Sequence, residues 1–394
     1  MNDRAAAPLT GIRVVELARI LAGPWMGQTL ADLGADVVKV ESPEGDETRR
    51  WGPPFVHGID GTQADAAYFH CCNRGKRSVI ADFRSARDLD FVGRLIERSD
   101  VVIENFKTGT LGRFGLDYAS VKARNPRLIY CSVTGFGQDG PYAARAGYDA
   151  MIQAMSGMMD ITGDPDGEPQ KIGVALADIL TGVYGVVAIQ AALAARERTG
   201  EGQQIDMALF DVMVGVLANQ ALNYFVSGTA PHRIGNAHPN IVPYQTFPTS
   251  DGHVMVAVGS NSQFAKLCSL LARPDIAMDG RYVTNELRVR NRGALIPMLR
   301  QELMAWKRDE LLTKLAALGV PAGPINTIAD VFADPQVLAR GMRVDFDRPE
   351  IAGGKLSGLR TPVRFSASQL CLDRTAPRLG EHTNAVAREL GIEP

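Results

Sequence analysis

The chain has 394 residues, of which 45% are hydrophobic and 22% are charged, and its net charge at neutral pH is about −2. A chain of this length can bury a full-sized core and is expected to form two domains. The ordinary composition and the interspersed charges exclude a basic surface for nucleic acid or membrane, so neither is expected as a partner.

The cysteines and the N-terminus bear on the cellular compartment. The five cysteines are odd in number and show no CxxC spacing, and the six histidines form no HExxH pattern, so reduced thiols and no metal site are expected. Residues 1–10 have neither a long apolar run nor an Arg-rich amphipathic pattern, which argues against a signal or transit peptide. The most apolar run, 179–195, contains Thr, Gly and Gln and is interpreted as a buried core helix. A cytoplasmic protein is therefore expected.

The first part of the chain alternates between predicted strands and helices. Residues 12–17 are typical of a buried strand, and after a turn at 22–24 a helix is predicted from the helical spacing of Met26, Leu30 and Leu33. Further strands are predicted at 36–41, 78–83, 101–104 and 128–134, and helices at about 86–98 and 118–124. This alternation predicts a parallel sheet covered on both faces, in a Rossmann-like α/β domain.

The pattern changes twice in the rest of the chain. Residues 142–225 are mostly helical, with one strand candidate at 204–207. Residues 243–258 predict an antiparallel hairpin, and helices are expected at about 262–271 and 294–318. The predicted domains are a large Rossmann-like domain over 1–227, a small α+β domain over 228–325, and a linker with a return to the large domain over 326–394.

A glycine motif after the strand at 128–134 has the GxGxxG spacing of a dinucleotide-binding loop, with Gly135, Gly137 and Gly140. The motif follows a late strand instead of the first βαβ unit, and Pro141 comes directly after its third glycine. A glycine-rich loop that permits close backbone approach is the preferred interpretation, and a dehydrogenase is not favoured.

Asp178 is the main candidate for chemistry. It stands where a stretch of small residues, 174–177, meets the long apolar helix. A helix N-cap is the ordinary role of an aspartate in such a place. The place also suits a nucleophilic carboxylate, because a helix N-terminus favours the ionised form and a covalent intermediate divides one difficult step into easier ones. Position alone leaves both interpretations open.

Other candidates lie near predicted strand ends. Asn105 and Phe106 follow the strand at 101–104, where ligands collect in open α/β sheets, although an Asn turn beside a core Phe is the alternative. Tyr148 could orient a carbonyl group through its hydroxyl, or it could be a core aromatic residue whose hydroxyl reaches solvent. Three arginines could each contact a phosphate or lie on the solvated surface: Arg19, Arg84 and Arg113.

Together these segments resemble the class III CoA transferases, the family of formyl-CoA, carnitine and related dicarboxylate CoA transferases. The resemblance covers nearly the whole chain and is carried by 21–24 (LAGP), 33–41 (LGADVVKVE), 45–49 (GDETR), 73–78 (NRGKRS), 104–106 (ENF), 145–149 (RAGYD) and the segment around Asp178. It implies a Rossmann-like large domain built from both chain ends, a small domain, and an interlocked homodimer in which each chain passes through a hole in the other.

The resemblance also implies site residues, with Asp178 as the catalytic nucleophile. The positions that match the family's CoA contacts are Arg19, Leu21, Ala22, Arg84, Asn105, Phe106, Arg113 and Tyr148. The candidates for the acid-binding pocket are Trp51, His238, Asn240 and Tyr244. Coenzyme A and acyl-CoA are expected as substrates, with no permanently bound cofactor and no metal. Formyl-CoA transferases have Gln at the place of Leu21 and a glycine-rich tetrad that this chain lacks, which argues against oxalate and formate.

Two other functions remain as alternatives, a 2-methylacyl-CoA racemase-type isomerase and a non-catalytic acyl-CoA-binding relative. The racemases resemble the same family but have His at the place of Tyr148, before Asp149. A tyrosine, with an ordinary pKa near ~10, shuttles protons at neutral pH less well than a histidine near ~6.5. This difference favours a transferase.

A finer resemblance, to the succinyl-CoA:glutarate CoA-transferase branch, is carried by 51–55, 241–245, 285–292 and 319–326. Close relatives act on itaconate, mesaconate, citramalate or other dicarboxylates. The predicted function is CoA transfer between an acyl-CoA such as succinyl-CoA and a short-chain dicarboxylic acid such as glutarate, through an aspartyl anhydride and an aspartyl-CoA thioester on Asp178. Three arginines are candidates for the acceptor's second carboxylate: Arg49, Arg50 and Arg233.

Overall fold

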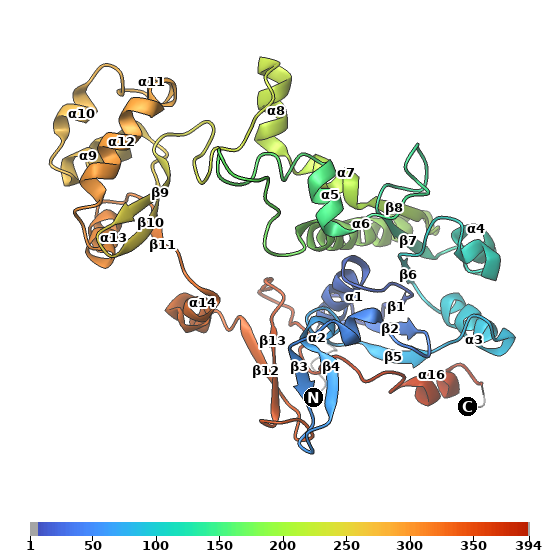
Figure 1. Ribbon diagram of the computed structural model, residues 1–394. Helices are drawn as coiled ribbons and strands as arrows, with labels where there is room; N and C mark the ends of the chain where they lie inside the picture. The colour runs from blue at the N-terminus through green and yellow to red at the C-terminus, as the bar shows by residue number, and fades with distance from the viewer. Residues whose placement is uncertain (1–6, 393–394) are drawn as a thin grey trace. The chain divides into compact units, whose positions relative to one another are not determined.

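A computed structural model describes residues 7–392, which divide into two compact units (Figure 1). Unit 1 consists of the chain up to Met158, of Ile172–Leu222, and of the chain from Pro335 onward, whereas unit 2 consists of Met159–Lys171 and Asn223–Asp334. The predicted domain limits of 1–227, 228–325 and 326–394 stay a prediction. The expectation about the N-terminus concerns residues 1–10, of which 1–6 lie outside the described residues.

Unit 1 is built on a six-stranded sheet in the order β5-β2-β1-β6-β7-β8. All neighbouring strands are parallel, which confirms the predicted α/β class. In the centre Val15 pairs with Val38 on one side and with Val102 on the other, and such valine-rich strands are typical of a sheet buried on both faces. The strands are β1 (Arg13–Glu16), β2 (Asp36–Glu41), β5 (Arg77–Ile80), β6 (Val101–Glu104), β7 (Ile129–Thr134) and β8 (Gln204–Ala208).

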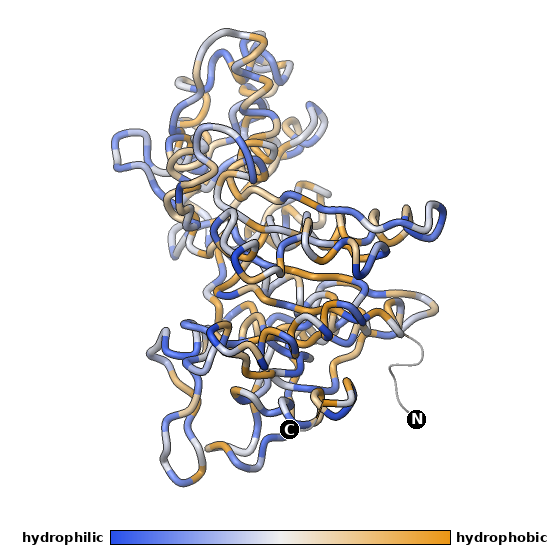
Figure 2. The backbone as a smooth tube through the Cα atoms, turned by 90° about the vertical axis from the view of Figure 1, so that its right-hand side faces the viewer, coloured by the Kyte–Doolittle hydropathy of each residue, from blue (hydrophilic) through white to orange (hydrophobic). Residues whose placement is uncertain are grey.

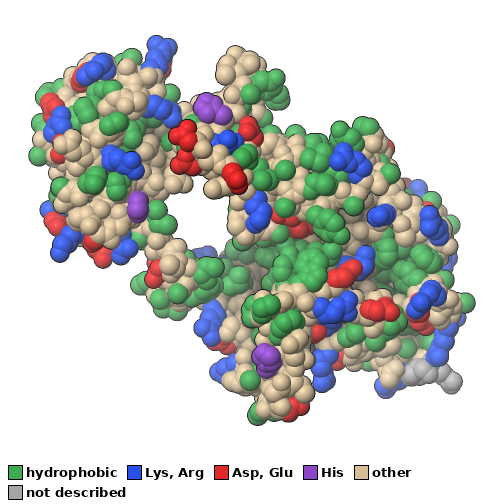
Figure 3. Space-filling model, in the orientation of Figure 1, with side chains coloured by type: hydrophobic (Ala, Val, Ile, Leu, Met, Phe, Trp, Pro, Cys, Tyr) green, Lys and Arg blue, Asp and Glu red, His purple; other side chains and the backbone are tan. Residues whose placement is uncertain are grey.

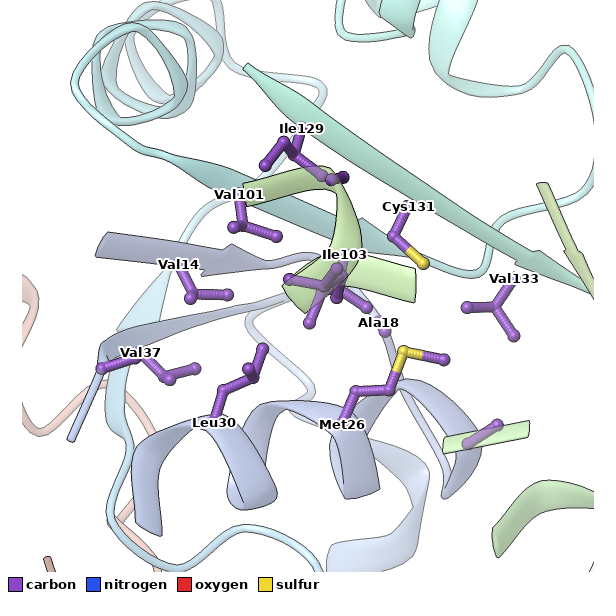
Figure 4. Packing of buried hydrophobic residues seen from close by; sticks show 14 of the residues in the cluster. Val14, Ala18, Met26, Leu30, Val37, Val101, Ile103, Ile129, Cys131 and Val133 are labelled. Atoms are coloured by element: carbon purple, nitrogen blue, oxygen red, sulfur yellow. The ribbon is translucent and has the colours of Figure 1, made fainter. Parts of the chain in front are cut away.

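Helices pack on both faces of this sheet. On one face lie α1 (Ala22–Asp32) and α6 (Leu176–Thr199), and on the other lie α3 (Ala86–Glu97) and α16 (Thr383–Glu389). Figure 4 shows Met26 and Leu30 of α1 facing the strand side chains Val14, Val37, Val101, Ile103, Ile129, Cys131 and Val133. In Figure 2 the strands in the middle of unit 1 are mostly hydrophobic, whereas its outlying loops are mostly hydrophilic.

Helices α1 and α6 approach closely because α6 has glycines at the contact. A Cβ on Gly182 would lie 2.9 Å from the Trp25 ring, and one on Gly185 would lie 2.3 Å from the Met26 side chain. By length and composition α6 could cross a membrane, but it packs on α1, as expected for a core helix. Its other face exposes apolar side chains that are 46–60% accessible: Val183, Tyr184 and Val187.

The other elements of unit 1 surround the sheet. Those before and around the core are η2 (Glu47–Arg50), β3 (Phe55–His57), β4 (Gln63–Ala66), α2 (Ala67–His70), η3 (Leu111–Phe114), α4 (Tyr118–Val121), α5 (Asp149–Met155) and α7 (Leu209–Gly215). Those near the C-terminus are α15 (Pro335–Ala339), β12 (Arg343–Asp347) and β13 (Lys355–Leu359). The chain runs from unit 1 into unit 2 within α8 (Ala218–Ser227).

Unit 2 combines a three-stranded antiparallel sheet with helices around its own core. The predicted hairpin is confirmed as β9 (Tyr244–Thr249) and β10 (Gly252–Ala257), and β11 (Ala322–Pro324) pairs with β10. Arg288 is fully buried here because its guanidinium donates to the carbonyl groups of Val242 and Tyr282. The helices are α9 (Asn261–Leu270), α10 (Pro274–Met278), α11 (Asn285–Arg290), α12 (Arg292–Leu303), α13 (Arg308–Ala317) and α14 (Ile328–Ala333).

Candidate active site

A cavity of about 370 Å³ in unit 1 lies beside the carboxyl ends of β6 and β7, the place where open α/β sheets hold ligands. Its walls come from the β1–α1 loop, the loop after β6, the segment before α5 and the start of α6. It brings together seven of the predicted residues: Arg19, Leu21, Ala22, Asn105, Phe106, Tyr148 and Asp178. Their proposed roles stay predictions.

The β1–α1 loop is held in place by Asn105. The Asn105 side chain accepts the Arg19 N–H at 2.9 Å and donates to the Arg19 carbonyl at 2.7 Å. The next residue, Ile20, has a φ of +73°, a conformation that β-branched residues rarely adopt. Its N–H lies 3.2 Å from the Asp46 carboxylate. Asn105, predicted as a ligand contact, therefore serves at least to fix the loop that lines the cavity.

Beneath this loop lies a fully buried cluster of four charges, which is formed by Glu16, Lys39, Asp46 and Lys76. The Lys39 ammonium lies 2.9 Å from Asp46 and 3.1 Å from Glu16, and it donates to the Ala18 carbonyl at 2.8 Å. Burial alone would lower the pKa of Lys39, but the neighbouring carboxylates outweigh it and raise this pKa. The cluster thus joins β1, β2 and the cavity loop through charges that are balanced internally.

Cations and aromatic rings collect at the cavity. The Arg19 guanidinium lies 5.7 Å from the centre of the Phe106 ring and forms an ion pair with Glu47 at 2.7 Å. Lys107 and Arg145 also line the cavity, and neither was predicted as a site residue from the sequence. Lys107 directly follows the predicted pair at 105–106, and that adjacency was the available signal.

Two predicted CoA contacts, Arg84 and Arg113, do not line the cavity. The Arg84 side chain is 82% exposed and pairs with Asp82 at 2.8 Å. Arg113 is exposed on η3. Their assignment to CoA stays a prediction.

The Asp178 carboxylate stands in the first turn of α6 and faces the cavity. The N-cap position belongs to Ala175, so the N-cap interpretation of Asp178 is wrong. Within residues 7–392 no hydrogen bond to this carboxylate is found. Burial, and then the charge of Asp149, raise the pKa of Asp178 to about 7. Burial and the neighbouring carboxylate therefore oppose the ionised form of Asp178 that the helix N-terminus is expected to favour.

Asp149 and Gln153 of α5 hold the segment that leads to Asp178. Asp149 accepts the Ala177 N–H at 2.7 Å and the Gln153 side-chain N–H at 2.8 Å. Gln153, which is fully buried, accepts the Ile172 N–H at 3.0 Å. These contacts fix residues 172–177 at both ends.

The glycine motif serves this arrangement. A Cβ on Gly135 would lie 2.6 Å from the Gly147 Cα, so the loop after β7 crosses the segment before α5 at close range. This confirms the preferred interpretation of the motif as a loop that permits close backbone approach.

Tyr68 on α2 is a neighbour of Asp178 that the sequence did not reveal. Burial, and then the charge of Asp178, raise the pKa of the Tyr68 phenol. The predicted acid-pocket residue Trp51 packs edge-to-face on Tyr68, with ring centres 5.3 Å apart. Trp51 therefore packs on a tyrosine that senses the charge of the nucleophile candidate.

The other acid-pocket candidates lie close together in the sequence of unit 2, with His238 and Asn240 in the loop before β9 and Tyr244 at the start of β9. His238 stacks on Tyr244 with ring centres 5.1 Å apart, and its ring nitrogen accepts the Asn240 N–H at 3.0 Å. The four-residue acid pocket stays a prediction.

The arginines considered for the acceptor's second carboxylate already have partners. Arg49 is buried and ion-paired with Glu41 and Asp65, which makes it unsuitable as a ligand contact. Arg233 pairs with Asp160 at 3.1 Å, and Arg50 donates to a backbone carbonyl at 2.8 Å.

The chain is similar to known proteins over nearly its whole length. Residues 9–383 match the model of the family described as CoA-transferase family III. Succinate–glutarate CoA-transferase of Agrobacterium fabrum is 56% identical, with 97% of this chain and 96% of that protein covered. Succinyl-CoA:glutarate CoA-transferase of Mus musculus is 41% identical, with 97% and 86% covered. The crystal structure of a CAIB/BAIF family protein from Brucella suis is 62% identical, has a TM-score of 0.86, and covers 98% of this chain and 99% of that chain.

Proposed function

The chain belongs to CoA-transferase family III, and we propose that it transfers CoA between succinyl-CoA and a short-chain dicarboxylate such as glutarate. The observation that carries the proposal is the Asp178 carboxylate, which faces the cavity without a hydrogen-bond partner among the described residues. The substrate pair is supported by the 56% identical relative, whose name gives succinate and glutarate.

The reaction proceeds in four exchanges at one carboxylate. An Asp178 oxygen attacks the succinyl thioester carbonyl, which gives a mixed anhydride and CoA thiolate. The thiolate attacks the aspartyl carbonyl and releases succinate, which leaves an aspartyl-CoA thioester. Glutarate attacks this thioester, so that a second anhydride and CoA thiolate form. The thiolate then attacks the glutaryl carbonyl, which gives glutaryl-CoA and restores Asp178.

The cavity supplies position and charge for these steps. Phe106 and Arg19 offer an aromatic face and a cation to a nucleotide, and Lys107 and Arg145 add positive charge for phosphates. The net reaction replaces one thioester by another of similar energy, so the protein contributes mainly orientation and stabilisation of oxyanions.

An interlocked homodimer belongs to the same proposal. An isolated chain leaves apolar side chains exposed on α6, and Phe225 and Val226 on α8 are 72% and 86% exposed. Figure 3 shows hydrophobic side chains gathered where Figure 1 places α1 and α6. Exposed apolar side chains of this kind are usual at obligate interfaces. A cytoplasmic location is likewise proposed, since the five cysteines form no disulfide within residues 7–392.

The proposal is tested with succinyl-CoA and isotope-labelled glutarate. Mass spectrometry is expected to show labelled glutaryl-CoA with the wild type and none with Asp178→Asn, whose CoA binding persists. A hydroxylamine-trapped aspartyl product separates an enzyme from a non-catalytic binder. Deuterium incorporation at the α-carbon of a 2-methylacyl-CoA, without transfer to any dicarboxylate, would instead establish a racemase.

A further inference from the structure

The start of α6 is capped by a side chain from another helix. Because Ala175 cannot cap with its side chain, the N–H groups of the first turn need other acceptors. Asp149 accepts the N–H of Ala177, the residue next to Asp178, at 2.7 Å. The nucleophile candidate therefore follows directly after a backbone group that α5 holds.

Gln153 completes this arrangement one helical turn later. It lies four residues after Asp149, so both side chains project from the same face of α5. Its N–H group donates to Asp149 at 2.8 Å, while its oxygen accepts the Ile172 N–H at 3.0 Å. The Ala177 and Ile172 backbone groups are both N–H donors, so Asp149 must accept from Ala177 and the Gln153 oxygen must accept from Ile172. This leaves the Gln153 N–H group to donate to Asp149.

The surroundings of Asp178 make the Asp149 charge effective. The titratable or charged side chains around the nucleophile are Asp149 of α5, Tyr68 of α2, and, among the cavity residues, Tyr148, Arg19, Lys107 and Arg145. Of these, Asp149 is the one whose charge raises the pKa of Asp178, after burial. A more basic carboxylate is a stronger nucleophile towards a thioester carbonyl.

We propose that Asp149 and Gln153 are positioning residues of CoA transfer, which hold residues 172–177 so that the Asp178 carboxylate faces the cavity beside a fixed negative charge. The inference rests on the proposed function, because the placement of Asp178 matters only if Asp178 is the nucleophile.

A donor–acceptor exchange tests the proposal. In Asp149→Asn, the amide oxygen still accepts the Ala177 N–H, but the new N–H₂ group meets the N–H₂ group of Gln153. Rotating the Gln153 amide by 180° would relieve this clash, but its N–H₂ group would then face the Ile172 N–H, which is also a donor. The double variant Asp149→Asn, Gln153→Glu restores every hydrogen bond, because the introduced carboxylate accepts both from the introduced amide and from the Ile172 N–H. It also moves the negative charge one side chain away from Asp178.

The rate is expected to separate these variants. For Asp149→Asn, kcat falls by at least roughly tenfold while the KM for succinyl-CoA changes by less than about threefold, since a mismatched buried pair displaces the nucleophile and not the CoA contacts. The double variant regains kcat to within about fivefold of the wild type. Unchanged kcat in Asp149→Asn, or a double variant no better than the single one, would overturn the inference.

The pH profile supplies a readout that a purely structural role would not move. Asp178 must be ionised to attack, so activity declines as the pH falls through its pKa. Removing the Asp149 charge lowers that pKa, and the acidic limb of kcat/KM moves to lower pH in Asp149→Asn and less far in the double variant. If the acidic limb of the kcat/KM profile stays at the wild-type pH in both variants, the inference that the Asp149 charge acts on Asp178 is refuted.

Two controls keep the outcomes distinct. If Asp149→Asn does not fold by circular dichroism, the double variant, with its hydrogen bonds restored, decides the question. If Asp178→Asn transfers CoA at the wild-type rate, the proposed function fails, whatever Asp149 does. If Asp178→Asn is inactive and the Asp149 variants behave as wild type, the positioning inference alone fails.

Discussion

Replacing Lys39 by methionine tests the buried charge cluster beneath the cavity loop. Lys39 is fully buried, and its ammonium contacts Asp46 at 2.9 Å, Glu16 at 3.1 Å and the Ala18 carbonyl at 2.8 Å. In the wild type the charges of Lys39 and Lys76 balance those of Glu16 and Asp46. Methionine fills a similar volume but leaves one buried carboxylate without its counter-ion. Removing one partner of a buried ion pair costs about 3–5 kcal/mol of unfolding free energy.

The expected loss is measured by urea unfolding followed by circular dichroism, with Lys355→Met as the matched control. Lys355 is 64% exposed and lies 3.9 Å from Asp347, so its removal is expected to cost about 0–1 kcal/mol. Adding Asp46→Asn to Lys39→Met removes the unbalanced charge and is expected to recover part of the loss. If Lys39→Met costs no more than the control, the idea that this cluster is internally balanced and stabilises unit 1 is wrong.

Three further predictions concern the nucleophile, the helix contact and the assembly. Because the pKa of Asp178 is raised to about 7, kcat/KM for succinyl-CoA is expected to fall about tenfold per pH unit below that value; a flat profile down to pH ~5 would contradict it. Gly185→Leu adds a side chain at a place where even a Cβ would lie 2.3 Å from the Met26 side chain. The urea midpoint is therefore expected to fall by the equivalent of about 1–3 kcal/mol, and adding Met26→Ala is expected to restore part of this loss. If the proposed dimer forms through the exposed apolar face of α6, Val187→Asp puts a charge into that interface and is expected to shift the mass in light scattering from dimer towards monomer. A dimer that Val187→Asp leaves unchanged would place the interface elsewhere.

The parallel sheet could be predicted because its strands are short runs rich in valine and isoleucine that alternate with helical segments. Residues 36–41 and 101–104 are rich in valine, and their strands are buried on both faces. Strand β11 was missed because Gly323 and Pro324 are typical of a loop, although β10 supplies the pairing that makes them a strand. The predicted helix at 294–318 is divided into α12 and α13.

The site residues at element ends could be predicted from the sequence, whereas contacts between residues far apart in the sequence could not. Asp178, Asn105 and Phe106 stand at strand and helix ends that the pattern identifies. The sequence could not show that Asn105 is engaged with the Arg19 backbone, because that contact joins residues 86 positions apart. Nor could it show the raised pKa of Asp178, because burial and the Asp149 charge arise only from the packing of α5 on α6.

The glycine contact between α1 and α6 affects which atoms move during turnover. Gly182 lies one turn after Asp178 and touches Trp25, so the first turns of the two helices are fixed against each other. We therefore expect the carboxylate on one helix and the backbone of Leu21 and Ala22 at the start of the other to keep a constant separation during the proposed exchanges. In the proposed mechanism the substrates then do the moving, because the sulfur of CoA and the acyl carbonyl must each approach a stationary carboxylate.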